Sequence, residues 1–151
     1  MVFQPRSGHQ GFLKMTYRFS SAAIALCVLA APAFAWDEAT DFRGLHIYTA
    51  SSEGISLTAV CDPDGAFIPP TNHLQVEIQG QPLEGPYSLM SDAHTFTGTM
   101  IAGAAISRDE ADWDDVVAVL KGGSAIELTA FNQTYKIDTG SPLPVSCGAD
   151  L

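Results

Sequence analysis

The chain has 151 residues, of which 46% are hydrophobic, and a formal net charge of −10. Its length suits one domain built around a single hydrophobic core. Nucleic acids and anionic membranes bind proteins through basic residues, so the acidic balance argues against either as a partner. It remains compatible with a basic protein partner, with a cation and with simple solubility.

Residues 1–35 are predicted to be a secretory signal peptide. Arg18 precedes the apolar stretch Ala22–Ala31, and Ala33-Phe34-Ala35 has the small-x-small form that a signal peptidase accepts. The stretch is shorter than the roughly 20 apolar residues that a membrane-spanning helix needs. We therefore expect a periplasmic or secreted protein whose mature form is a single β-rich domain, residues 36–151, with no membrane insertion after cleavage.

Met15 is the expected translation start. A signal peptide that begins there has ordinary proportions, whereas residues 1–14 add nothing recognisable. Cys27, inside the apolar stretch, leaves lipidation open as an alternative. The preceding residue is Leu26, however, where a lipidation site prefers a small side chain.

Removal of the leader makes the chain more acidic. All 17 acidic residues follow Ala35, together with four basic residues, so residues 36–151 carry a formal charge of −13. The four basic residues are Arg43, Arg108, Lys121 and Lys136. A surface of this charge favours basic macromolecules over anionic ones.

Two cysteines, Cys61 and Cys147, follow the leader. In an exported protein, two cysteines most simply form one disulfide. Catalytic pairs usually have the short C-x-x-C spacing, which is absent here. We therefore predict a structural disulfide that closes a loop of about 86 residues and contributes roughly 4–5 kcal/mol in the chain-entropy model.

Alternation of apolar and polar residues predicts strands at 45–49, 55–61 and 73–80. The expected buried faces are, in that order, Leu45, Ile47 and Thr49; Ile55, Leu57, Ala59 and Cys61; and Leu74, Val76 and Ile78. Turn residues predict a short hairpin connection at 51–54 and a turn at 62–65. The prolines predict loops at 68–72 and 81–86.

The second half of the chain continues this pattern. Residues 94–106 predict one long or bent strand, with Gly98 or Gly103 at a bulge or a close approach. Residues 124–131 and 134–139 predict a hairpin that turns at Asn132-Gln133. Together, these segments predict a mainly β fold: a small antiparallel β-sandwich or barrel with one short helix and a single disulfide.

The one helix is expected after residue 106. Ser107 and Glu110 fit a capping box, with serine at the N-cap and glutamate three residues later. Gly122-Gly123 is expected to stop the helix. The apolar stripe consists of Trp113, Val116, Val117 and Leu120.

Residues with metal-binding or catalytic chemistry show no known spacing. His46, His73 and His94 lack ligand patterns such as H-x-x-x-H, and His46 is expected on the solvent face of its strand. The acidic residues 109–115 lack the pattern of a calcium loop and complement a helix N-terminus. The chain also contains no G-x-S-x-G nucleophile elbow and no phosphate-binding glycine loop. We therefore predict no catalytic residues, no metal and no cofactor.

A recognition surface is predicted from aromatic and acidic residues. Tyrosine and tryptophan often anchor protein interfaces. The residues assigned to this surface are Trp36, Tyr48, Tyr87, Asp112, Asp114 and Asp115. The alternative interpretation is that Trp36, together with Phe42, covers the open end of the fold.

An exported domain of this length, with one cysteine in a mid-chain strand and another near the C-terminus, resembles many small periplasmic β proteins. These include inhibitors of lysozyme, whose targets are strongly basic enzymes. The chain lacks the S-G-x-x-Y loop of one such group. Size, charge and cysteine count alone therefore carry the resemblance.

These observations favour a non-enzymatic exported domain that binds another macromolecule, expected to be a protein, at the cell envelope. A more specific alternative is an acidic inhibitor of a basic hydrolase. The third hypothesis is an enzyme or a metal-binding protein whose site forms only in the folded structure.

Overall fold

The computed structural model describes residues 36–145 and 147. The predicted signal peptide, its start at Met15 and the lipidation alternative at Cys27 lie outside these residues. The elements in chain order are β1 (Asp37–Thr40), β2 (His46–Ser52), β3 (Ile55–Cys61), β4 (His73–Ile78), β5 (Gln81–Pro82), β6 (Gly85–Met90), β7 (Thr95–Met100), β8 (Ala104–Ile106), α1 (Trp113–Leu120), β9 (Ala125–Ala130) and β10 (Gln133–Asp138).

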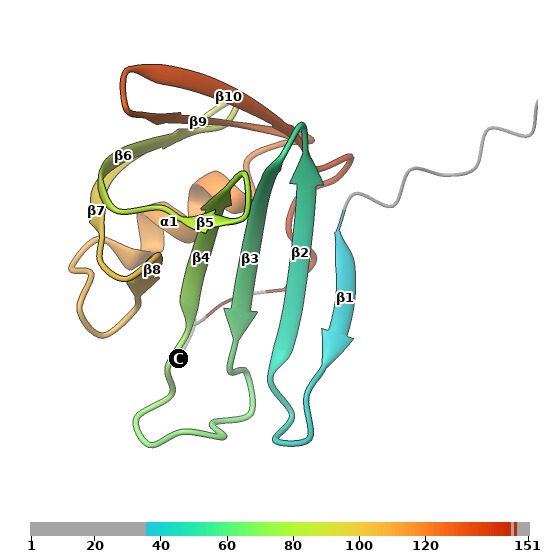
Figure 1. Ribbon diagram of the computed structural model, residues 1–151. Coiled ribbons are helices and arrows are strands. Elements are labelled where there is room, and N and C mark those ends of the chain that lie inside the picture. Colours follow the sequence, from blue (N-terminus) through green and yellow to red (C-terminus); the bar gives the residue numbers. More distant parts are fainter. Residues whose placement is uncertain (1–35, 146, 148–151) are drawn as a thin grey trace, which may run out of the picture. The chain divides into compact units, whose positions relative to one another are not determined.

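These strands form two antiparallel sheets (Figure 1). The first sheet has the order β1-β2-β3-β4-β5, with β8 also paired to β4, and the second has the order β10-β9-β6-β7. The mainly β, antiparallel prediction with one short helix is confirmed. Within the described residues, both sheets have open edges and no barrel closes.

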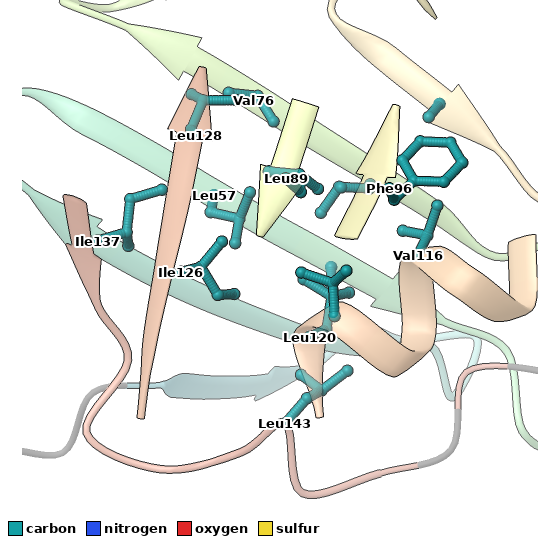
Figure 2. Close-up of a cluster of buried hydrophobic side chains, with 14 of the residues drawn as sticks. Leu57, Val76, Leu89, Phe96, Val116, Leu120, Ile126, Leu128, Ile137 and Leu143 are labelled. Carbon is teal, nitrogen blue, oxygen red and sulfur yellow. The ribbon is translucent and has the colours of Figure 1, made fainter. Parts of the chain in front are cut away.

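The core lies where the apolar faces of the two sheets meet α1 and the C-terminal tail (Figure 2). Leu57 and Val76 come from the first sheet, Leu128 from the second and Leu120 from α1, and each is buried. The predicted buried faces of β3 and β4 are confirmed, with Ile78 only partly buried. In these strands the alternation of apolar and polar residues correctly predicted the buried residues, because one face of each strand meets the core.

The two predicted hairpins form with two-residue turns. Glu53 and Gly54 have φ values of 49° and 83°, and Phe131 and Asn132 have values of 52° and 59°. Positive φ at both turn positions matches the right-handed twist of the flanking strands. The second turn therefore lies one residue earlier than the predicted Asn132-Gln133.

The predicted burial pattern of β2 is wrong. Tyr48 and Ala50 are buried, whereas Ile47 and Thr49 are only partly buried. In the β2–β3 register, Tyr48 lies opposite Ala59 and Ala50 lies opposite Leu57. Since residues opposite each other share a face of the sheet, the buried residues of β3 determine which residues of β2 point inward.

Residues 94–106 form two strands rather than one. β7 belongs to the second sheet and β8 to the first, so the chain crosses between the sheets at residues 101–103. Gly103 has a φ of 72°, and a Cβ atom there would lie 2.6 Å from the Cβ of Pro82. The predicted close approach at Gly103 is therefore confirmed, and it marks the crossing.

The helix begins at Trp113 and not after Ser107. The Ser107 hydroxyl oxygen instead accepts the backbone N–H of Asn72 at 3.0 Å, which joins two loops. The helix ends at Leu120, shortly before the predicted stop at Gly122-Gly123. The capping-box prediction is thus wrong because the serine has a partner in tertiary structure.

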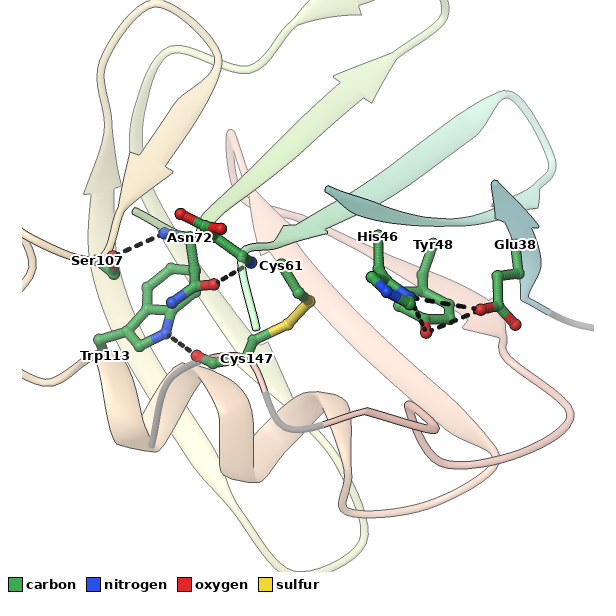
Figure 3. Close-up of a disulfide and its surroundings, with 9 residues drawn as sticks. Glu38, His46, Tyr48, Cys61, Asn72, Ser107, Trp113 and Cys147 are labelled. Atoms are coloured by element: carbon green, nitrogen blue, oxygen red, sulfur yellow. Dashed lines mark hydrogen bonds and ion pairs between the residues drawn. A yellow bond between two sulfur atoms is a disulfide. The ribbon is translucent and has the colours of Figure 1, made fainter. Parts of the chain in front are cut away.

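The predicted disulfide between Cys61 and Cys147 is confirmed (Figure 3). Their Cα atoms lie 4.9 Å apart and both residues are buried. Beside the disulfide, the indole Nε1–H of Trp113 donates to the carbonyl oxygen of Cys147 at 2.7 Å. The end of β3, the helix and the C-terminal tail are therefore tied together at one point.

Candidate functional site

The aromatic part of the predicted recognition surface is buried. Trp36, Tyr48 and Tyr87 all belong to the hydrophobic core, so the structure corrects their assignment to an exposed surface. Tyr48 points inward on the same face as the buried residues of β3. The centre of the Tyr87 ring lies 5.8 Å from the centre of the Phe96 ring. The indole Nε1–H of Trp36 donates to the carbonyl oxygen of Ser141 at 2.9 Å. The acidic part differs, since Asp112, Asp114 and Asp115 are all exposed.

The most exposed large apolar side chains of the described residues lie on two loops. Ile68 is 98% exposed and Phe42 is 96% exposed, while Phe67 is also exposed. Phe42 lies in the loop 41–45 between β1 and β2, and the others lie in the loop 62–72 between β3 and β4. The loops are side by side at the lower end of the first sheet (Figure 1). We call them together the two-loop end.

Asp62 organises the longer loop. Its carboxylate accepts the backbone N–H groups of Ala66 at 2.5 Å, Phe67 at 2.9 Å and Thr71 at 3.3 Å. Its own backbone N–H donates to the side-chain oxygen of Asn72 at 2.7 Å. Because the residue is only 1% exposed, these hydrogen bonds compensate the burial of a charge and fix the loop in one conformation.

Asp41 organises the shorter loop in the same way. Its carboxylate accepts the backbone N–H groups of Arg43 at 2.8 Å and Leu45 at 3.0 Å. It also accepts the Nε–H of Arg43 at 2.9 Å. A carboxylate that bonds to the backbone a few residues later is a local turn device of aspartate.

Arg43 joins the two loops. Its guanidinium carbon lies 5.3 Å from the ring centre of Phe42 and 5.1 Å from the ring centre of Phe67. Cation–π contacts at this distance contribute about 0.5–1 kcal/mol at exposed sites. The two-loop end is therefore one surface, in which each loop is held by its own hydrogen bonds and Arg43 contacts aromatic rings of both loops.

The two aspartates have lowered pKa values. Burial by itself would raise the pKa of Asp62, but the backbone N–H groups of Phe67, Ala66 and Thr71 outweigh burial and lower it. At Asp41, desolvation likewise acts to raise the pKa, and the N–H groups of Leu45 and Arg43 lower it. Both carboxylates are therefore ionised, and hold their loops, at neutral pH.

A groove of about 400 Å³ adjoins the longer loop. It lies between that loop and the start of α1, and its lining residues are Pro69, Pro70, Asn72, Ser107, Arg108, Glu110, Ala111, Trp113 and Asp114. The exposed Asp112 and Asp115 are sequence neighbours of the lining residues Trp113 and Asp114. The acidic part of the predicted surface thus adjoins the longer loop.

The three histidines lie on different elements. His73 is on β4, where burial lowers its pKa, while His94 is exposed between β6 and β7. His46 is 30% exposed and shares the face of Tyr48, which corrects its predicted position on the solvent face. In the described part of the chain, no three His, Cys, Asp or Glu side chains group together as metal ligands, and no helix is long and apolar enough to cross a membrane.

Comparisons with protein-family models, with curated proteins and with solved structures found no match to this chain.

Asp62 provides a test of how the longer loop is held. Because its pKa is lower in the folded protein, its carboxylate stabilises the fold above the unfolded pKa near 4, and this contribution is lost as the pH falls through the folded value. Asp62→Asn is expected to cost about 1–3 kcal/mol at pH 7. The difference from the wild type should shrink below about pH 4. Urea unfolding from pH 7 to pH 3 measures both effects.

Asp64→Asn, at an exposed position in the same loop, is the matched control and should leave stability unchanged. Parallel pH profiles for Asp62→Asn and the wild type would contradict the role assigned to this carboxylate.

Proposed function

We propose that this chain is an exported, non-enzymatic β domain that binds another protein at the cell envelope through its two-loop end. The observation that carries the proposal is the near-complete exposure of Phe42 and Ile68 on neighbouring loops held by internal hydrogen bonds. Apolar groups gathered on one exposed surface often mark interaction sites. A loop that is already ordered loses little conformational entropy when it binds.

Charge supports a basic partner. Residues 36–151 carry a formal charge of −13. Glu110 and Asp114 line the groove beside the longer loop together with Arg108, and Asp64 is exposed on the loop itself. Asp112 and Asp115 add further exposed carboxylates at the start of α1, so acidic groups outnumber basic ones there. Such a surface attracts basic proteins over long range and speeds their association at low salt. The apolar loop tips would then provide the contacts that hold the complex together.

Export rests on the leader and on the disulfide. Residues 1–35 have the pattern of a signal peptide. The Cys61–Cys147 disulfide is of a kind that persists in oxidising compartments such as the periplasm.

An acidic inhibitor of a basic hydrolase is the more specific form of the same proposal. It is favoured by the loop 62–72, which presents Ile68 next to two prolines and is fixed by Asp62. An inhibitor loop of this kind would occupy the cleft of its target. Inhibition of a basic hydrolase in step with binding would support this form, and binding without inhibition would leave only the general one.

Site-directed crosslinking tests the surface. A photoreactive phenylalanine analogue is placed at Phe42 or at Ile68 of the full chain, expressed in its native host, and crosslinked proteins are identified by mass spectrometry. The expected result is one dominant basic partner from both positions. Phe131, also exposed but on the β9–β10 turn, is the matched control and should not capture it. Equal capture from all three positions, or none, would argue against the proposal.

Substitutions at the loop tips give the affinity test. Phe42→Ser and Ile68→Ser should each weaken binding to the captured partner by about 30-fold or more, as expected for interface hot spots. Both side chains are exposed, so the melting temperature should fall by no more than the loss of the weak Arg43–Phe42 contact explains. Phe131→Ser should bind normally. Unchanged affinity in both loop variants would refute the role of the two-loop end.

A further inference from the structure

Three polar side chains of different chemistry converge at the edge of the first sheet (Figure 3). Glu38 of β1 lies directly opposite Tyr48 of β2 in the strand register. His46 precedes Tyr48 by two residues on the same strand, so its side chain lies on the same face. The His46 and Tyr48 rings are stacked with their centres 6.3 Å apart. Two paired strands therefore hold a carboxylate, an imidazole and a phenol together.

The three donor atoms form a nearly equilateral triangle. The phenol oxygen of Tyr48 lies 3.1 Å from Oε1 of Glu38 and 3.4 Å from Nδ1 of His46, and the last two atoms are 3.6 Å apart. Metal–ligand bonds of about 2.0–2.2 Å in a tetrahedral set place neighbouring ligand atoms roughly 3.3–3.6 Å apart. The two separations that involve His46 lie within this range, and the 3.1 Å separation between Tyr48 and Glu38 is slightly shorter. Small movements of the exposed Glu38 side chain would therefore bring all three donors to one side of a first-row transition metal.

Two of the three donor side chains are accessible to solvent. Tyr48 is buried and fixed in the core, with only 3% of its surface exposed. The side chains of Glu38 and His46 are 55% and 30% exposed. The phenol is therefore held in a fixed position. The Glu38 carboxylate and the partly exposed His46 ring are reached by solvent, which would admit the ion and supply water as the remaining ligands.

We propose that Glu38, His46 and Tyr48 form a binding site for a divalent transition-metal ion, with Cu²⁺ bound more tightly than Zn²⁺. One imidazole nitrogen and two oxygens are a mixed donor set that suits both ions, and affinities of such sites generally rise to a maximum at Cu²⁺. The phenol O–H donates to Glu38. On binding, this proton would be released to solvent and the ion would take its place. The ion would join β1 to β2.

Isothermal titration of the untagged protein, produced from the full chain and stripped of metal with a chelator, tests the site. Cu²⁺ should bind with one-to-one stoichiometry and should raise the melting temperature. His46→Ala and Glu38→Gln should each weaken Cu²⁺ binding about tenfold or more. Loss of a residue that only hydrogen-bonds to a metal ligand already lowers metal affinity by about 10–100-fold. Tyr48→Phe should weaken Cu²⁺ binding and abolish any absorption change that arises from coordination of the phenol.

His94→Ala is the matched control, because this histidine is exposed and distant in sequence from the cluster. Its Cu²⁺ affinity should equal that of the wild type. Failure of the wild type to bind Cu²⁺ or Zn²⁺ at millimolar concentration would overturn the proposal. So would binding that survives both Glu38→Gln and His46→Ala, since Glu38 is exposed and its substitution by glutamine should not disturb folding.

Discussion

A Cys61→Ala, Cys147→Ala double variant is expected to lose about 4–5 kcal/mol of unfolding free energy, because the disulfide closes a loop between residues 86 positions apart. Small domains have a total stability of about 5–15 kcal/mol, so this loss would leave a marginal fold. Most of the effect comes from the unfolded chain, which gains conformational freedom when the crosslink is absent.

Other native contacts still hold the C-terminal tail when the disulfide is absent. The Leu143 side chain of the tail is buried in the core. The backbone N–H of Leu143 donates to the carbonyl oxygen of Leu120 at 2.9 Å. Urea unfolding with and without reductant measures the disulfide contribution in the wild type. Reductant should not affect the double variant. An unchanged wild-type transition under conditions that fully reduce the disulfide would contradict the expectation.

Much of the fold could be predicted because it depends on local pattern. β4 and β9 alternate, as does β3 up to Ala59, so their positions follow from the period-two pattern. The cysteine pair could be predicted because residues 36–151 contain no other cysteine. These features need no knowledge of which strands become neighbours.

The errors occur where tertiary structure decides between two local patterns. Around β2, apolar residues fall on both faces, and pairing with β3 decides which face is buried. β6 was not predicted, because its Pro86 indicated a loop. Pro86 pairs only with Thr99 of β7, and pairing with β9 begins at the next residue, Tyr87. A proline is tolerated in a strand where one edge has no partner.

The candidate sites were harder to predict than the core. The exposure of Phe42 and Ile68 depends on the paths of two loops, although Asp41 followed by Gly44 and Asp62 followed by Gly65 were local turn signals. The cluster of Glu38, His46 and Tyr48 depends on the register of β1 against β2. No spacing along the chain indicates it, because its members come from two strands and the phenol is a rare ligand.

Trp113→Ala is expected to destabilise the protein by about 3–5 kcal/mol, the usual cost of removing a buried large aromatic side chain. Trp113 is buried at the start of α1, where its ring belongs to the core and its Nε1–H donates to the carbonyl oxygen of Cys147 at 2.7 Å. Trp113→Phe keeps most of the packing and should cost about 1 kcal/mol for the hydrogen bond. Urea unfolding of both variants measures the two contributions separately.

The same tryptophan shows whether the tail stays in place without its crosslink. In the Cys61→Ala, Cys147→Ala background, the carbonyl of residue 147 remains beside Trp113 only if the tail still packs against α1. If the tail separates, Trp113→Phe should cost almost nothing there, because the hydrogen bond is already lost, and the two changes would be clearly non-additive. An equal cost of Trp113→Phe in both backgrounds would instead show that core packing alone holds the tail on the helix, and that the disulfide acts on the unfolded chain.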